Sequence, residues 1–372
     1  MTTVHSRTDS RIVHREIAGL ASKFGKTIHL FVQDGLGDAT ASANGLTIVD
    51  TGRRRNRIAR AIFGSMAMFR SVRRARPDIV HFHDPELVPI AILLKLLGAA
   101  VIYDVHEDLP RQIRHKTHVP APLKPVVAAM ASAVETIGAI FFDGIVAATP
   151  TIAARFPRSK TIVVFNYPSL DEFPAVPLTY QSRKAQFCYV GGIARTRGSI
   201  DMVRAMANLD TDAQLVLAGP ITPENHRFEI QSEAGFKRAV FAGWLDREAT
   251  RDLMLASRAG LVLLHPTPAY VDAYPVKLFE YMAAGLPVVA SDTKINRSII
   301  AGADSGLLVE PENPGAAAAA MKWILDNPEQ AEEMGRRGRA AIEERFNWRS
   351  ELAKLIDLYE KIMAQRAGNQ HG

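Results

Sequence analysis

The chain has 372 residues, of which 47% are hydrophobic and 23% charged, and this composition supports a sizeable core and about two domains. Its single cysteine, Cys188, excludes a disulfide within one chain, and its apolar neighbours favour a buried thiol over a nucleophile. No apolar run reaches the roughly 18 residues needed to span a bilayer, and the first residues are too polar for a signal peptide. We therefore expect a cytoplasmic protein, either soluble or peripheral at the inner face of a membrane.

The net charge is +6, and much of the excess lies in one window that contains no acidic residue. The arginines of this window are Arg53, Arg54, Arg55, Arg57, Arg60, Arg70, Arg73, Arg74 and Arg76. Such density indicates an anionic partner or, alternatively, a merely solvated surface. Nucleic acid is disfavoured because the only aromatic residues in the window, Phe63 and Phe69, fit the core face of a helix. An anionic membrane surface bound through Arg53, Arg54, Arg55 and Arg57 is the partner we expect.

Strands and helices alternate through the first half of the chain, as in a doubly wound parallel sheet. Strands are predicted at residues 1–5, 27–32, 78–82, 99–105 and 144–148. Helices are predicted at residues 12–24, 58–72 and 125–140, with another that ends at Leu97.

A proline-rich stretch over residues 156–182 marks a linker, and a second α/β unit follows it. Its strands are predicted at residues 187–190, 214–218, 240–242, 260–264, 288–290 and 306–309. The chain then ends with an amphipathic helix over residues 348–363.

The most informative segment is 272–291, which follows an apolar strand and precedes another. Pro275 suits the first turn of the helix between these strands, where its missing N–H has no helical partner. Asp272 and Glu280 therefore bracket a helix N-terminus at a sheet edge, where free N–H groups attract an anion such as phosphate. Lys277 lies in the first turn, where a cation opposes the helix dipole unless an anion binds there. The alternative is a plain strand–helix–strand unit with solvated charges.

This segment resembles the acid-x7-acid motif of retaining glycosyltransferases of family 4, which have the GT-B fold of two doubly wound, Rossmann-like α/β domains facing a central cleft. The resemblance implies an acceptor-side domain at residues 1–165, a linker at 166–183 and a nucleotide-sugar-binding domain at 184–347. It also implies a C-terminal helix at 348–366 that returns to the first domain. The implied substrates are a nucleotide diphosphate sugar donor and a glycan or lipid-linked acceptor.

The resemblance also assigns residues to the donor. Glu280 corresponds to the acid that binds the ribose hydroxyls, and Asp272 to the acid that faces the sugar. The backbone groups that meet the diphosphate belong to Tyr274, Pro275, Val276, Lys277 and Leu278. The chain departs from the family in having Asp272 where most members have Glu, and Tyr-Pro where Phe-Gly is usual.

A glycine-rich loop follows the strand predicted at 187–190. Gly191 and Gly192 allow close approach of the backbone to a ligand, and Arg195 and Arg197 provide charge for a phosphate. In the family this loop carries a Gly-Arg pair and a later Lys-Gly. Here Gly192 replaces the arginine of the pair, while Arg197 precedes a glycine as the family lysine does. We assign the diphosphate to Arg197 and Lys277, with Arg195 in reserve; exposed arginines on a turn are the alternative.

His106 follows the strand predicted at 99–105, at the sheet edge where ligands bind in open α/β folds. It resembles the family histidine that faces the donor sugar, although a capping or core histidine is the alternative. His81 and His83 share one face of a strand, but no third ligand has a recognisable metal-site spacing. The segment 210–212 has the Asp-x-Asp form and is predicted to be a solvated turn.

The sequence thus predicts a retaining glycosyltransferase with His106, Arg197, Lys277 and Asp272 as catalytic candidates and no metal or other cofactor. The predicted role is assembly of bacterial exopolysaccharide or lipopolysaccharide on a lipid-linked acceptor. Two alternatives stay open, namely a nucleotide-sugar epimerase of the same fold and a non-catalytic scaffold that retains the transferase architecture.

Overall fold

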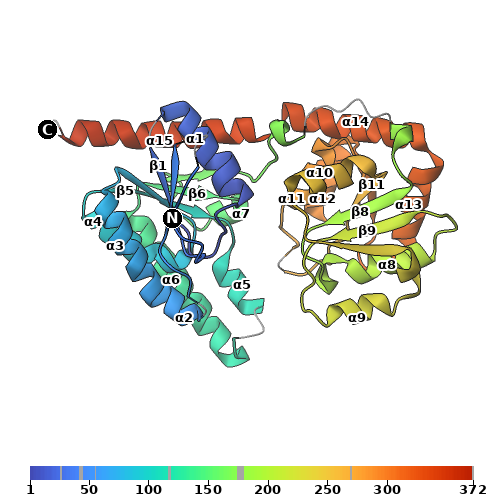
Figure 1. Ribbon diagram of the computed structural model, residues 1–372, viewed down its shortest axis with the longest axis horizontal. Helices are drawn as coiled ribbons and strands as arrows, with labels where there is room; N and C mark the ends of the chain where they lie inside the picture. Colours follow the sequence, from blue (N-terminus) through green and yellow to red (C-terminus); the bar gives the residue numbers. More distant parts are fainter. Residues whose placement is uncertain are drawn as a thin grey trace. The chain divides into compact units, whose positions relative to one another are not determined.

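The computed structural model describes residues 1–25, 27–41, 45–54, 56–115, 119–173, 180–268 and 270–370. The chain forms two compact units, Met1–Asn166 with Arg349–Gly372 (unit 1) and Tyr167–Trp348 (unit 2) (Figure 1). Arg55 of the predicted membrane contact lies outside the described residues, as do residues 174–179 of the predicted linker.

Unit 1 contains two separate sheets where the sequence predicts one. The larger sheet pairs β4 (Ile79–Phe82), β5 (Ala100–Val105), β6 (Gly144–Ala147) and β7 (Thr161–Val163) in that order, all parallel. In the smaller sheet, β3 (Leu46–Asp50) pairs in parallel with β1 (Ile28–Val32) and antiparallel with β2 (Ala39–Ala41). The sequence pattern misses β2 and β7, which have only three residues each, and β3, whose apolar residues are interrupted by Thr47 and followed by Asp50.

The first two residues link β1 and β4, since Met1 bonds to the β4 side and Thr2 to β1. Its amino group donates to the His81 carbonyl at 2.6 Å, and its own carbonyl accepts from the His83 N–H at 3.2 Å. The Thr2 N–H donates to the Phe31 carbonyl at 3.0 Å. The strand predicted over residues 1–5 is wrong, because no strand forms there, but residues 1 and 2 do link the two sheets.

The helices of unit 1 cover both faces of these sheets. They are η1 (Ser10–Ile17), α1 (Ala18–Phe24), α2 (Arg57–Ala59), η2 (Arg60–Gly64), α3 (Ser65–Ala75), η3 (Pro85–Leu87), α4 (Val88–Leu96), α5 (Leu109–His115), η4 (Ala121–Leu123), α6 (Lys124–Phe141) and α7 (Pro150–Ala153). The last helix of the chain, α15 (Trp348–Gln370), groups with unit 1 from Arg349 onward. The helix predicted over 12–24 begins with wider π-type turns and ends at Gly25, which has a φ of 59° that favours glycine.

Unit 2 is built on one six-stranded parallel sheet in the order β10-β9-β8-β11-β12-β13. The strands are β8 (Gln186–Val190), β9 (Gln214–Ala218), β10 (Ala239–Gly243), β11 (Ala259–Val262), β12 (Val288–Ser291) and β13 (Gly306–Val309). All six are predicted by the sequence to within two residues, since each is a short apolar run bounded by turn residues. Cys188 is buried in β8, and burial raises the pKa of its thiol to about 12.

Helices cover both faces of this sheet as well. They are η5 (Leu170–Glu172), η6 (Tyr180–Ser182), η7 (Arg195–Arg197), α8 (Ser199–Ala207), α9 (His226–Gln231), η8 (Ala234–Arg238), α10 (Arg247–Ala256), α11 (Val276–Ala283), α12 (Lys294–Ala303), α13 (Pro314–Asp326) and α14 (Pro328–Glu344). The strand order reverses between β8 and β11, and in such sheets the crevice at the carboxyl ends of those two strands is the place where ligands bind.

Candidate active site

The loop after β8 brings its backbone unusually close to neighbouring segments. Gly191 has a φ of 128°, and a β-carbon on Gly219 would lie 2.1 Å from the Gly191 carbonyl oxygen. A β-carbon on Gly198, which has a φ of 75°, would lie 2.1 Å from the Leu263 carbonyl oxygen beyond the end of β11. Because no side chain fits these positions, glycine is required for the loop to follow this path.

Two cationic side chains converge over Gly191. A β-carbon at this position would lie 2.9 Å from Lys277 Nζ and 3.8 Å from an Nη of Arg197. A β-carbon on Gly192 would lie 3.2 Å from the same Arg197 nitrogen. Four of the predicted donor residues, from two segments far apart in sequence, therefore meet at the reversal point of the sheet.

Neither cation forms an ion pair with a carboxylate within the described part of the chain. Burial, followed by repulsion from Arg197, lowers the pKa of Lys277 to about 8, although Glu280 partly opposes the shift. Two partly buried cations that repel each other leave a concentration of positive charge that an anion would neutralise.

Two tyrosines hold these cations in place. Arg197 Nε donates to the Tyr270 hydroxyl at 3.1 Å, while Lys277 Nζ lies 5.1 Å from the centre of the Tyr189 ring. Burial lowers the pKa of Arg197, but the Tyr270 hydrogen bond and Tyr189 more than offset it, so the guanidinium stays charged. The sequence gives no signal for Tyr189 or Tyr270, since a tyrosine in a strand or loop is compatible with many roles.

The N-terminus of α11 lies beside this charge. The sequence predicts Pro275 in the first turn of this helix, but it is the residue before the helix. Its side chain offers no acceptor for the N–H groups of Val276 and Lys277. The helix end therefore adds a partial positive charge to the site. Leu278 is fully buried, so only its backbone is available to a ligand.

Asp272 and Tyr274 lie, partly buried, on the loop between β11 and α11, and Glu280 is partly buried on α11 itself. Arg195 behaves differently from Arg197. It is exposed and forms an ion pair with Glu229 at 2.8 Å, so the structure does not bring it to the cluster of cations.

In unit 1, His106 follows β5 and belongs to a polar network at the ends of β4 and β5. Its Nε2 lies 3.1 Å from His83 Nδ1 and 3.4 Å from a carboxylate oxygen of Asp104. Arg11, which is buried, donates to both oxygens of Asp104 at 3.0 and 3.1 Å and to Glu16 at 2.8 Å. Arg11 therefore holds the segment after Met1 against the sheet edge, a role that its position in the sequence does not reveal.

Burial and charge oppose each other in this network. Burial would raise the pKa of Asp104, but the Arg11 guanidinium holds it well below its usual range. Burial and the nearby Asp104 raise the pKa of Glu16 well above normal, and burial lowers the pKa of His83 well below normal. The network therefore keeps one carboxylate ionised and favours a neutral His83.

Four side chains of this network, Glu16, His81, His83 and Asp104, place ligand atoms within 4.8 Å of one another. The sequence analysis misses this set, because Glu16 and Asp104 come from separate elements with no metal-site spacing. Arg11 already provides a positive charge in contact with both carboxyl groups. Asp210 and Asp212 of the Asp-x-Asp segment are exposed on the turn before β9, as the sequence predicts.

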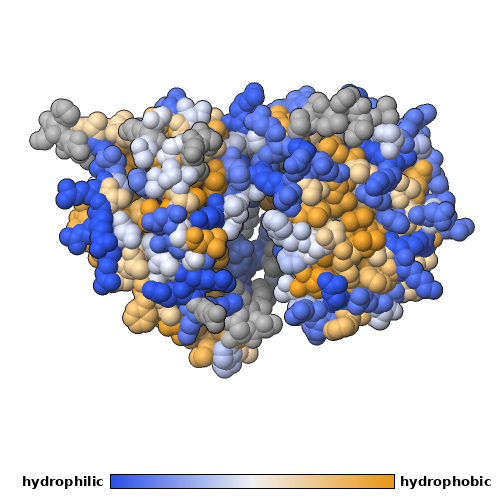
Figure 2. Space-filling view, viewed as in Figure 1, coloured by the Kyte–Doolittle hydropathy of each residue, from blue (hydrophilic) through white to orange (hydrophobic). Residues whose placement is uncertain are grey.

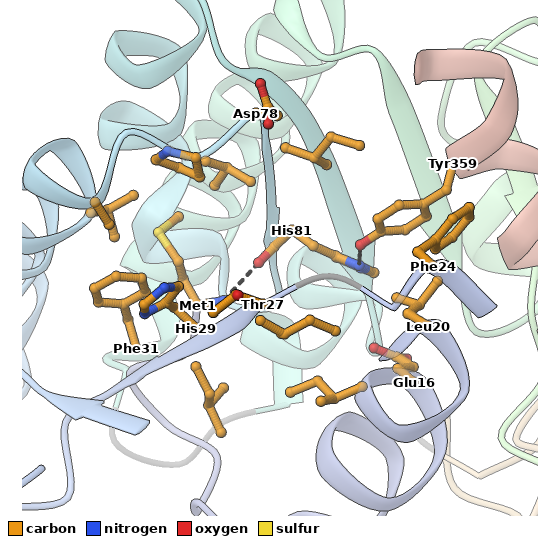
Figure 3. A pocket seen from close by; sticks show the side chains of 18 of the residues that line it. Met1, Glu16, Leu20, Phe24, Thr27, His29, Phe31, Asp78, His81 and Tyr359 are labelled. Carbon is orange, nitrogen blue, oxygen red and sulfur yellow. Dashed lines mark hydrogen bonds between the residues drawn. The ribbon is translucent and has the colours of Figure 1, made fainter. Parts of the chain in front are cut away.

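A cavity of about 560 Å³ lies inside unit 1 between β1 and β4 (Figure 3). Figure 3 shows His81 at its centre, where its Nδ1 lies 2.9 Å from the Tyr359 hydroxyl of α15 and its carbonyl accepts from Met1. Most of the lining is apolar, with Leu20, Phe24 and Phe31 among its members. The cavity is distinct from the cation cluster of unit 2 and contains none of the predicted donor residues.

Solved structures identify the fold. The chain superposes on sucrose-phosphate synthase from Thermosynechococcus elongatus with a TM-score of 0.76 and 18% identity, over 96% of this chain and 94% of that one. It superposes on WaaG, a glycosyltransferase involved in lipopolysaccharide biosynthesis, with a TM-score of 0.71 and 14% identity, over 96% and 98% of the chains. Anabaena HepE in complex with UDP-glucose gives a TM-score of 0.72 at 12% identity, over 97% and 98%. The fold is therefore the GT-B fold of glycosyltransferases.

Two family descriptions match successive parts of the sequence, the glycosyl transferase 4-like domain over residues 10–164 and glycosyl transferases group 1 over residues 176–341. The chain belongs to this group of glycosyltransferases. It is 26% identical to the D-rhamnosyltransferase WbpZ of Pseudomonas aeruginosa over 299 residues, or 76% of this chain and 74% of that protein. It is 24% identical to a glycogen synthase of Mycobacterium tuberculosis over 306 residues, or 79% and 71%.

Proposed function

We propose that this glycosyltransferase moves a sugar from a nucleotide diphosphate donor to an acceptor hydroxyl with retention of configuration. Unit 2 binds the donor in this proposal. The observation that supports it most is the pair Arg197 and Lys277, two cations over a glycine loop with no carboxylate paired to them among the described residues. A diphosphate matches this site in charge and in its need for several donors.

The proposed reaction depends on the departure of the nucleoside diphosphate. Negative charge grows on the diphosphate as the glycosidic bond breaks, so Arg197, Lys277 and the N–H groups at the start of α11 bind it more strongly in the transition state. The leaving phosphate accepts the proton of the acceptor hydroxyl on the same face of the sugar, which gives retention. We assign contact with the sugar to Asp272 and His106, and we propose that the reaction needs no metal.

The relatives favour a role in building surface polysaccharide. WbpZ is named as a rhamnosyltransferase and WaaG as an enzyme of lipopolysaccharide biosynthesis. We propose a lipid-linked acceptor in exopolysaccharide or lipopolysaccharide assembly. Arg53, Arg54 and Arg57 are exposed and provide the charge for contact with an anionic membrane at its cytoplasmic face.

Glu280 provides the direct test of donor binding. Glu280→Ala should weaken nucleoside diphosphate binding by roughly tenfold to a hundredfold, because a hydrogen bond to a charged group is worth about 1.5–3 kcal/mol. Titration calorimetry with UDP and GDP measures this loss, and Glu329→Ala, an exposed acid in the same unit, is the control. Unchanged nucleotide affinity in Glu280→Ala would remove this residue from the donor site.

The same preparation separates the rival functions. A panel of nucleotide-sugars is incubated with the protein alone and with candidate acceptors. Slow hydrolysis of one donor supports a transferase, whereas interconversion of the donor sugar without release of nucleotide indicates an epimerase. Binding of nucleotide without any turnover indicates a scaffold.

A further inference from the structure

Helix α6 presents its large apolar side chains outward and its small ones inward. Its buried residues are Ala128, Glu135, Gly138 and Ala139. A β-carbon on Gly138 would lie 2.8 Å from Val88 of α4, so the inward face is adapted to close packing. In an ordinary surface helix of a water-soluble protein the apolar stripe faces the core. The reversed arrangement of α6 therefore indicates a partner for the outward face.

The outward residues form one continuous stripe, because they recur at intervals of three or four residues. We name this stripe the α6 face, and it consists of Leu123, Val126, Val127, Met130, Val134, Ile137 and Phe141. Met130 is 63% exposed and Val126 is 56% exposed. The segment Ala121–Phe141 is also long and apolar enough to cross a membrane by length and composition, which the sequence analysis misses because Glu135 and several small residues interrupt the run.

The contacts of Glu135 explain why α6 is packed on the surface of unit 1 and is not a membrane-spanning helix. It is buried on the inward side, where its carboxylate accepts from the Tyr103 hydroxyl at 2.9 Å and from Arg155. These contacts fix the inward face of the helix to β5 and α7. The α6 face alone is available to a partner.

Neighbouring helices continue the apolar surface. Helix α4 packs against both α6 and α3. Leu93, Leu96 and Leu97 are exposed at the end of α4, and further exposed apolar side chains lie on α2, η2 and α3, namely Ile58, Ile62, Phe63 and Met66. Figure 2 shows apolar patches along the lower edge of unit 1, over the region of α2 and α6 in Figure 1.

The charges beside this surface are positive. The segment from α2 to α3 carries exposed Arg57, Arg70, Arg73 and Arg74 and no acidic residue, and the only acid of α6 is the buried Glu135. An apolar stripe flanked by arginines matches an anionic bilayer, whose headgroups meet the cations while its acyl chains meet the aliphatic groups. A second copy of the chain would instead bring arginines toward arginines.

We propose that the α6 face, with the apolar residues of α2 to α4, inserts into the interfacial layer of an anionic membrane. The inference deepens the membrane contact suggested under the proposed function, and it adds a hydrophobic anchor to a purely electrostatic one. The arginines attract the protein to the surface, and the aliphatic stripe provides affinity that salt does not screen. Docking would hold unit 1 at the surface from which a lipid-linked acceptor is presented.

Sedimentation with phosphatidylglycerol/phosphatidylcholine vesicles tests the proposal. The variant Val126→Gln/Met130→Gln/Val134→Gln should partition about tenfold or more weakly than the parent, because each inserted aliphatic side chain contributes through its buried apolar area. The control, Phe228→Gln/Trp244→Gln, removes apolar side chains of unit 2 that are more exposed than those of the α6 face, and it should bind as the parent does. Thermal unfolding should be unchanged in both, since the replaced side chains are exposed.

Two further measurements make the test sharper. Arg53→Ser/Arg54→Ser/Arg57→Ser should weaken binding and leave a residual affinity that depends less on salt than that of the parent, because Arg70, Arg73 and Arg74 remain. In Met130→Trp, the tryptophan emission should shift to the blue only when anionic vesicles are added. Equal vesicle binding by the parent and the glutamine variant would overturn the proposal, as would self-association in light scattering that this variant abolishes. Donor hydrolysis, measured without vesicles, reports on the proposed function separately.

Discussion

Lys277→Met should make the protein more stable while it destroys the donor site. The structure gives the magnitude, because the pKa of Lys277 is about 8 instead of 10.5. Each pKa unit corresponds to about 1.4 kcal/mol, so holding this ammonium charged costs the folded state about 3 kcal/mol. Methionine fills a similar volume without the charge, and we expect it to recover about 1–3 kcal/mol of stability.

The assay is chemical denaturation at pH 7, combined with pyrophosphate binding by calorimetry. Pyrophosphate is the probe because it does not depend on which base the donor carries. The control is Lys322→Met, since Lys322 is an exposed lysine of the same unit paired with Asp326. That change should alter stability by less than about 0.5 kcal/mol and should leave pyrophosphate binding intact.

The pH dependence of Lys277→Met follows from the sign of the shift. Folding lowers the pKa of this lysine, so the destabilisation is complete below pH 8 and disappears as the pH rises toward 10.5. The gain from Lys277→Met should therefore be largest near pH 7 and should fade at alkaline pH. Parent affinity for pyrophosphate should fall by about tenfold for each pH unit above 8, because the free protein then loses the charge that the anion needs.

Two outcomes would refute this reasoning. If Lys277→Met loses several kcal/mol of stability, the lysine has a structural role. If it binds pyrophosphate as well as the parent does, the two cations do not form an anion site.

Three other predictions concern the remaining charged groups. Arg197→Ala should reduce kcat about 100-fold with a smaller effect on KM in donor turnover assays, because the contact strengthens as the diphosphate leaves. His106→Ala should lose transferase activity at unchanged thermal stability, while a chelator should leave the parent active; chelator inactivation reversed by a divalent ion would contradict the metal-free reaction. Arg11→Met should cost about 3–5 kcal/mol in denaturation experiments at pH 7, because Asp104 and Glu16 stay buried without their cation. Part of the lost stability should return as the pH falls and the carboxylates take up protons. A loss below 1 kcal/mol would show that the contacts of Arg11 with Asp104 and Glu16 contribute little to stability.

The sequence predicts unit 2 better than unit 1 for a physical reason. Each strand of unit 2 is a continuous apolar run, because a parallel sheet covered on both faces needs apolar residues at every position. In unit 1, β2 and β7 have only three residues each, and no periodicity can be read from so short a run. The split of the first sheet also depends on how Met1 bonds to the β4 side and Thr2 to β1, which residue patterns do not encode.

The candidate site shows the same division between local and distant information. Gly191, Arg197 and Lys277 are recognisable because their spacing relative to predicted strands places them at one sheet edge. The contact of Arg195 with Glu229, by contrast, depends on a helix that follows more than thirty residues later. The family resemblance ranks Arg197 ahead of Arg195, because Arg197 precedes a glycine, and the side-chain contacts in the folded loop agree with this ranking.

The features that reduce the stability of unit 2 are the ones that suit it to a leaving diphosphate. Lys277 and Arg197 repel each other in a partly buried site, and the start of α11 adds further positive charge. A neutral or singly charged ligand would relieve this repulsion only in part. A diphosphate relieves it most when its charge is greatest, which is after the bond to the sugar has begun to break. In the reaction that we propose, the destabilisation of the free protein is therefore released along the reaction coordinate, which favours departure of the nucleotide over tighter binding of the intact donor.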